Sequence, residues 1–261
     1  MFLTDFVKAA TRAPALASHD ELAMMPSDAA IHAPSTITEA SDQMNVPSAT
    51  ILSPIDIKGA VMRNRLAVAP MTRISATPAG VPTPAMRDSY ARFAKGGFGL
   101  VITEGLYTDT AFSQGYPGQP GLANDEQTRE WATITKEIHV HGALAFAQLM
   151  HAGALGQSDR FRVNNVAPSA IRPKGEQMSF YYGDGQYAVP VEITDAEISE
   201  AIQGFVDTAI RAVRGAGFDG IEIHGANGYL LDQFLSAETN QRADRWGNLV
   251  SATPSGGWLQ S

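Results

Sequence analysis

Three side chains near the end of the chain are of types that can polarise a carbonyl group and supply a proton. His224 and Asn227 both carry N–H groups that can point at one acceptor, and Tyr229 carries a phenolic proton. They follow a short apolar run at residues 220–223, which is typical of a buried strand. A (β/α) barrel presents its chemistry in this way, on loops at the C-terminal ends of strands. A strand end with a capping histidine and a turn asparagine fits the same residues equally well, so the neighbouring elements must decide.

The chain ahead of this stretch alternates between apolar strands and amphipathic helices. Short apolar runs predict buried strands at residues 65–70, 100–103, 143–147 and 218–224. Capping residues and apolar stripes of helical spacing predict helices that begin at Thr83, Asn124 and Thr194 and end near Gly96, Gly142 and Gly215. Strand and helix in turn indicate βα units around a parallel sheet, which is the α/β class.

Each predicted strand is followed at its C-terminal end by polar or conformationally special residues. These are Thr72, Glu104 and Gly105, Gln148 and His151, and finally His224 and Asn227. The carboxyl ends of parallel strands share one edge of a sheet, where ligands bind in parallel α/β folds, so we expect these residues to meet in one site. Residues 155–193 interrupt the alternation with several prolines and glycines. We expect a functional excursion there, with a small hairpin over the site.

The composition excludes several other kinds of chemistry. The 261 residues include no cysteine, which rules out a thiolate nucleophile, an iron–sulfur cluster and cysteine-ligated zinc. The formal net charge of −8 argues against a nucleic-acid binder. No apolar run approaches the roughly 20 residues needed to span a membrane. Residues 1–49 have little periodicity and fit neither a transit peptide nor a secretory signal, so we expect a disordered leader on a cytoplasmic protein.

Several ordered motifs run through residues 52–247. They read APMTR at 69–73, ITEG at 102–105, AQLMHAG at 147–153, IEIHGANGYLLDQFL at 221–235 and NQRADRWG at 240–247. In this order they resemble the Old Yellow Enzyme family of FMN-dependent ene-reductases, which are (β/α)8 TIM barrels. The long motif at 221–235 is hard to obtain by chance, whereas the first motif alone would be weak.

The resemblance implies roles for the earlier motifs around a bound FMN. Pro70, Met71 and Thr72 would lie along the isoalloxazine ring, with the Thr72 hydroxyl near its O4/N5 edge. Gly105 would bring backbone close to the ring. Gln148 would hydrogen-bond the pyrimidine edge of the flavin.

The resemblance also implies the reaction. His224, which would contact the flavin as well, and Asn227 would bind the carbonyl or nitro oxygen of an α,β-unsaturated substrate. Hydride would pass from flavin N5 to the β-carbon, and Tyr229 would protonate the α-carbon. Two fixed donors stabilise the negative charge that then develops on the oxygen. NADH or NADPH would reduce the flavin first.

The match stops halfway through the family's barrel. We predict a TIM barrel truncated to about its first four βα units, with residues 50–247 forming this N-terminal half and residues 248–261 an unrelated tail. The missing half would supply the basic residue beside the flavin and the phosphate-binding loops, which in barrels follow the seventh and eighth strands. Open sheet edges would favour a homo-oligomer.

The sequence is also compatible with two other kinds of function. The chain is alternatively an inactive half-barrel, or an interaction protein, that does not retain FMN. Flavin retention would distinguish these from an ene-reductase. A barrel of another chemistry, such as an aldolase or other lyase, is favoured less, because neither a strand-end Schiff-base lysine nor a metal-binding cluster is apparent.

Overall fold

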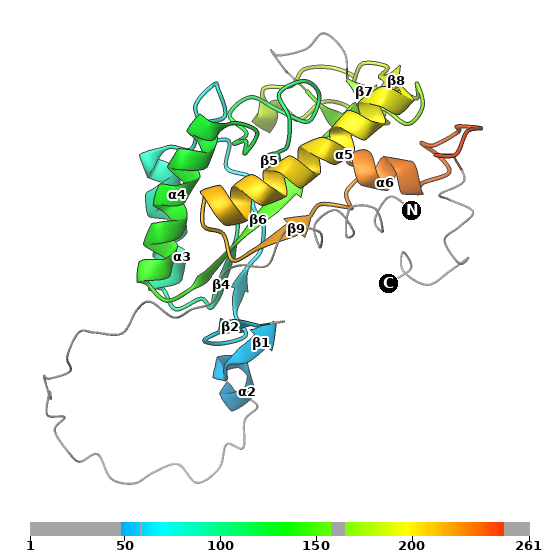
Figure 1. The fold of residues 1–261 in the computed structure, drawn as a ribbon. Helices are drawn as coiled ribbons and strands as arrows, with labels where there is room; N and C mark the ends of the chain where they lie inside the picture. Colours follow the sequence, from blue (N-terminus) through cyan, green and yellow to red (C-terminus); the bar gives the residue numbers. More distant parts are fainter. Residues whose placement is uncertain (1–47, 58, 158–164, 248–261) are drawn as a thin grey trace, which may run out of the picture.

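The centre of the structure is a five-stranded sheet with helices packed against one of its faces (Figure 1). The computed structural model describes residues 48–57, 59–157 and 165–247. The described part opens with elements that the sequence analysis did not predict: α2 (Ser48–Leu52) and the antiparallel pair β1 (Ile55–Ile57) and β2 (Ala60–Met62). All but the last two residues of the expected leader, and the whole of the expected tail, lie outside the described residues.

The strands of the sheet are parallel and lie in the order in which they occur along the chain. They are β3 (Ala67–Val68), β4 (Leu100–Ile102), β6 (Leu144–Met150) and β9 (Gly220–Ile223). The short strand β5 (Leu106–Tyr107) follows β4 and pairs with the last residues of β6. Parallel strands in sequential order are what the first four positions of a (β/α)8 barrel require, so the predicted fold class is confirmed.

Three helices connect these strands and begin where the sequence analysis predicted. They are α3 (Pro84–Lys95), α4 (Asp125–Val140) and α5 (Asp195–Ile210), and a π-helical turn, η3 (Arg211–Gly215), extends the last of them. The Thr83 hydroxyl and the Asn124 side-chain oxygen accept from backbone N–H groups of the first turn, and Thr194 forms a full capping box with Glu197. These side chains accept hydrogen bonds from N–H groups that have no partner inside the helix. The helix starts could therefore be predicted from a few neighbouring residues in the sequence.

The core lies between the sheet and the helices. Val101, Ala145 and Ala147 on the strands are fully buried, and so is Trp131 on α4. The indole N–H of Trp131 donates to Gly121 O at 3.0 Å, so this large buried side chain keeps a polar partner. The other face of the sheet carries half-buried side chains, including Phe146. The sheet therefore has one closed face and one open face, as a barrel wall has before the barrel is closed.

The third strand is longer than predicted. The sequence predicts an end at residue 147, whereas β6 continues to Met150 because Leu149 and Met150 find partners in β5. Gln148 therefore lies within the strand. The first strand is shorter than predicted, and a helix that was not predicted, α6 (Leu230–Leu235), follows the strand β9.

The excursion at 155–193 is only partly described, because residues 158–164 lie outside the described residues. Its elements are η1 (Gly153–Leu155), β7 (Val166–Ala167), η2 (Ser179–Tyr181) and β8 (Val191–Glu192). Strands β7 and β8 pair in parallel, and an antiparallel bridge joins Glu176 to Gln186 in the part between them. Tyr181 of this excursion reaches the candidate site described below.

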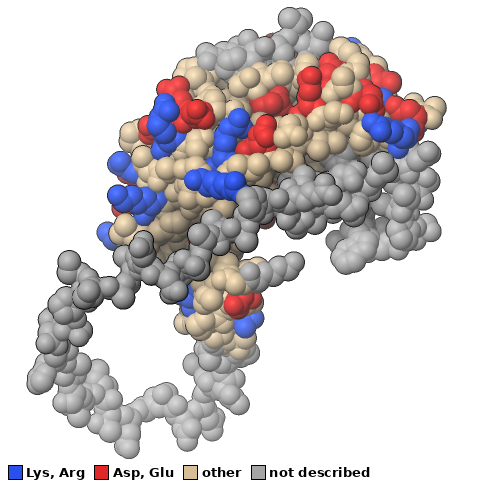
Figure 2. All heavy atoms as spheres, in the orientation of Figure 1, with Lys and Arg blue, Asp and Glu red and all other residues tan. Residues whose placement is uncertain are grey.

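Charged side chains are unevenly distributed on the face seen in Figure 2. Acidic side chains gather over the region of α5, whereas lysine and arginine side chains gather over the region of α3 and α4. On this face the described residues form no unbroken basic strip of the kind that nucleic-acid binding requires. Within the described ranges, none of the helices combines the length and the apolar character that crossing a membrane would need.

Candidate active site

A cavity of about 420 Å³ opens at the C-terminal ends of the parallel strands. Seven of the eight residues to which the resemblance assigns a role line it: Pro70, Thr72, Gly105, Gln148, His224, Asn227 and Tyr229. The eighth, Met71, is 45% exposed and lines a different cavity. Of the two other strand-end residues expected in the site, Glu104 also lines that different cavity, and His151 is buried and does not line the site. Met150, Tyr181 and Glu222 also line the site but were not predicted as site residues. Glu222, in β9, lies two residues before His224, and this period-two spacing was the available signal.

A tight turn after β9 presents the three proposed catalytic side chains. The His224 N–H still donates to Leu149 O at 2.9 Å, as if the strand continued. Asn227 and Gly228 then take left-handed conformations, with φ of 58° and 75°. Asparagine and glycine adopt this conformation more readily than other residues. The turn brings the rings of His224 and Tyr229 to 4.8 Å between centroids, edge to face.

A backbone hydrogen bond indicates which nitrogen of His224 carries the proton. The Ala226 N–H donates to Nδ1 at 3.4 Å, so Nδ1 acts as an acceptor and Nε2 carries the proton of the neutral ring. Burial lowers the pKa of His224 below its ordinary value, against the opposing attraction of the Glu222 and Asp232 carboxylates. His224 is therefore a neutral hydrogen-bond donor at neutral pH.

Tyr229 remains protonated over a wide pH range. Burial raises the pKa of the Tyr229 phenol to about 12, and the neighbouring phenols of Tyr181 and Tyr187 add to the effect. Desolvation disfavours the charged phenolate, and none of the causes of this pKa shift is a positively charged group. The side chain can thus serve as a proton donor but not, near neutral pH, as a base.

Gln148 is held within β6 by residues in or directly after the neighbouring strands. Its backbone N–H donates to the Thr103 hydroxyl at 3.1 Å, and the residue is 7% exposed. Its side-chain N–H donates to Glu222 Oε1 at 2.6 Å. Glu222 therefore takes one of the two amide N–H groups, and the amide oxygen can accept a hydrogen bond from a ligand.

An aromatic pair supports Thr72. The Thr72 and Tyr116 hydroxyls lie 3.0 Å apart, and either can donate to the other. The Tyr116 ring is buried and stacks on Tyr181, with 4.3 Å between centroids and 15° between planes. Burial raises the pKa of Tyr116 well above its ordinary value, so its phenol stays neutral and can donate to Thr72.

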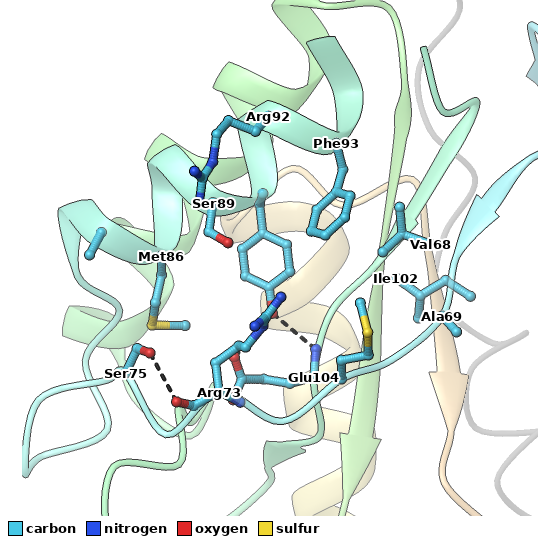
Figure 3. A pocket seen from close by; sticks show the side chains of 13 residues that line it. Val68, Ala69, Arg73, Ser75, Met86, Ser89, Arg92, Phe93, Ile102 and Glu104 are labelled. Carbon is cyan, nitrogen blue, oxygen red and sulfur yellow. Dashed lines mark hydrogen bonds between the residues drawn. The ribbon is translucent and has the colours of Figure 1, made fainter. Parts of the chain in front are cut away.

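The loop that carries Pro70 to Arg73 is fixed by a buried glutamate. Glu104 Oε2 accepts from the Arg73 N–H at 3.0 Å, and Oε1 accepts from the Tyr90 hydroxyl at 3.2 Å. Arg73 and Glu104 line a second cavity of about 220 Å³, together with α3 and residues of β3 and β4 (Figure 3). Burial raises the pKa of Glu104, against the hydrogen bonds from Arg73 and Tyr90. Met71 lines this second cavity, and the motif alone did not predict that placement.

The chain belongs to the NADH:flavin oxidoreductase / NADH oxidase family, whose model matches residues 50–250. The 12-oxophytodienoate reductase 7 of Oryza sativa subsp. japonica is 37% identical over 215 residues, which cover 80% of this chain and 53% of that protein. A probable flavin mononucleotide-dependent alkene reductase of Leishmania infantum is 33% identical and covers 77% of this chain and 55% of its own length. A protein of Claviceps fusiformis that is 34% identical, over 78% of this chain and 51% of its own, is named a probable inactive dehydrogenase.

The solved structures agree with this assignment. The Old Yellow Enzyme homologue from Zymomonas mobilis superposes with a TM-score of 0.70 at 36% identity, over 76% of this chain and 54% of that one. The resemblance drawn from the motifs is thus confirmed. The chain spans about half the length of the curated relatives it matches.

The residues around the cavity fit the ring of an FMN. The cavity volume lies in the range of pockets that hold small ligands and cofactors, roughly 300–1,000 Å³. The Gln148 amide oxygen and the Thr72 hydroxyl supply polar groups on one side, and the turn after β9 supplies donors on the other. Gly105 contributes backbone only, and a side chain there would overlap Met150. The described residues contain no cluster of three metal-ligating side chains.

Proposed function

We propose that this chain carries the flavin-facing and substrate-facing half of an FMN-dependent ene-reductase site. The observation that supports this most directly is the shared cavity. It brings Thr72 and Gln148, proposed to face the flavin, together with His224, Asn227 and Tyr229, proposed to face the substrate. The names of the rice and Leishmania infantum relatives agree with the reaction class.

The chain's own residues would hold and polarise the substrate. His224 Nε2–H and the Asn227 amide would donate to the carbonyl or nitro oxygen of an α,β-unsaturated substrate. Bound FMN, reduced by NADH or NADPH, supplies the hydride for the β-carbon. The Tyr229 phenol would give its proton to the α-carbon, and its high pKa keeps it protonated for that step. Thr72 and the Gln148 amide oxygen would hold the edges of the flavin ring.

The oxygen-binding pair can be tested apart from flavin binding. The double variant His224→Ala with Asn227→Ala should retain FMN but lose binding of a phenol such as 4-hydroxybenzaldehyde, because both donors to the ligand oxygen are removed. Visible-spectrum titration of the FMN-loaded protein measures both properties. His141→Ala, at the end of α4 and outside the cavity, is the control and should bind normally. Unchanged phenol affinity in the double variant would contradict the assignment.

A second candidate function is an inactive half-barrel that acts through interaction. One observation from the comparisons favours it: the relative from Claviceps fusiformis is named as inactive. Within the described residues, β3 and β9 each pair on one side only, which leaves two sheet edges for association with another copy. This candidate predicts that the chain associates but retains no flavin.

A further inference from the structure

A buried glutamine connects the two sides of the candidate site. We propose that Gln233 is a positioning residue whose side-chain amide ties the 226–229 turn, on the substrate side, to residues 152–154, which follow β6 on the flavin side. This inference rests on the proposed function for its catalytic meaning. Its geometric content, that Gln233 fixes the turn, can be judged without flavin.

The first end of the connection lies at Gly228. Its N–H donates to Asp232 Oδ2 at 2.8 Å, and its carbonyl oxygen accepts from Gln233 Nε2 at 2.6 Å. Gly228 separates Asn227 from Tyr229, and the left-handed backbone there belongs to neither a helix nor a strand. Because the N–H and the carbonyl oxygen of Gly228 are both hydrogen-bonded, the backbone there is fixed, and it sets the directions of the Asn227 and Tyr229 side chains.

The second end lies at residues 152–154. Gln233 Oε1 accepts from the Ala154 N–H at 3.1 Å, and Nε2 also approaches Ala152 O at 3.4 Å. Gly153, between them, has a φ of 59°, and a Cβ atom added there would overlap the Gln233 amide. The backbone thus makes room for this side chain, which is 3% exposed.

The segment held in this way is continuous with the flavin side of the cavity. Residues 152–154 follow Met150, the last residue of β6, which also carries Gln148. The Leu230 N–H donates to His151 O at 3.0 Å and adds a second link between the same two segments. Gln233 therefore sets the spacing between the groups proposed to face the flavin and those proposed to face the substrate.

Two variants of the full 261-residue chain disrupt this connection by different routes. Gln233→Leu keeps a similar side-chain volume but removes the amide, and Gly153→Ala displaces the amide sterically. Gln127→Leu is the control for losing a buried glutamine, because Gln127 is equally buried and its amide bonds residues outside the turn. Gly97→Ala is the control for alanine at a left-handed glycine, since nothing lies within 4 Å of its added Cβ.

Hydrogen exchange and phenol binding test the proposal together. In Gln233→Leu and Gly153→Ala, the amides of Ala154 and of residues 228–230 should exchange about ten-fold faster or more, with those of β4 unchanged. In the FMN-loaded chain, the dissociation constant of 4-hydroxybenzaldehyde should rise about ten-fold while that of FMN stays within about two-fold. A role in packing alone would not split the two affinities in this way.

The possible outcomes distinguish failure of the Gln233 proposal from failure of the proposed function. Unchanged exchange at residues 228–230 in Gln233→Leu and Gly153→Ala would overturn the proposal, as would an equal effect in the Gln127→Leu and Gly97→Ala controls. Faster exchange with unchanged phenol affinity would also overturn the positioning role. If the unmodified chain retains no FMN, the proposed function fails, and the exchange data alone decide whether Gln233 fixes the turn.

Discussion

Protonation states at single residues decide what the cavity can do. Burial lowers the pKa of His224, whose Nδ1 accepts a backbone hydrogen bond, and burial keeps the Tyr229 phenol protonated. Both groups thus donate hydrogen bonds, and neither presents a negative charge to an oxygen that becomes negative during the reaction. A cavity with this polarity suits the addition of hydride to an activated alkene better than the abstraction of a proton.

The role of Tyr229 gives a prediction in both rate and pH. Tyr229→Phe should slow alkene reduction by about 10²-fold or more while leaving flavin reduction by the nicotinamide unchanged, because only alkene reduction needs the proton. A folded pKa of about 12 means that the acid form persists as pH rises, so alkene reduction should stay level up to about pH 10. Stopped-flow measurement of the two half-reactions checks both statements. Equal slowing of the two, or a loss of rate centred near the ordinary phenol pKa, would count against this role.

The helices pack against the strands that carry the site, and N-terminal capping contributes to the stability of these helices. Thr194 caps α5, and Phe205 of the same helix is buried in the core against the sheet. Thr194→Ala removes both hydrogen bonds of the Thr194 hydroxyl, including the one that it accepts from the Glu197 N–H, and should lower the free energy of unfolding by about 1 kcal/mol. Ser199→Ala, on the exposed surface of α5, should change it much less. Urea denaturation compares the two variants, and equal effects would contradict the capping account.

Signals between residues close in sequence predicted where the helices begin. Contacts between residues far apart in sequence determined the features that the sequence did not predict. The helix starts at Thr83, Asn124 and Thr194 were readable because a cap and its N–H partner are three residues apart. The extension of β6 to Met150 was not, because it depends on pairing with β5, more than 40 residues earlier in the chain.

Within the site, too, the sequence pattern predicted some residues and not others. His224, Asn227 and Tyr229 could be expected to share a cavity with Gln148, because parallel strands end at one edge. Tyr181 could not be placed, because it comes from an excursion whose path the sequence pattern does not determine.

At the scale of the whole molecule, the described residues form one wall of a barrel. Helices cover the outer face of the sheet, and the inner face and both edges are left open within the described residues. The candidate site lies at the C-terminal end of this wall and contains polar groups for both a flavin ring and a substrate oxygen. In barrels generally the phosphate-binding loops follow later strands, so the proposal depends on the residues of this chain that would face the flavin ring.

The most direct test of the account is flavin retention by the 261-residue chain itself. The chain would be expressed with excess FMN, desalted, and examined by visible absorption, with circular dichroism as the control for folding. The account predicts a bound-flavin band that survives desalting, and a weaker band when Gln148→Leu removes the amide at the ring edge. A folded chain that leaves the column colourless would contradict the central claim and would favour the inactive half-barrel.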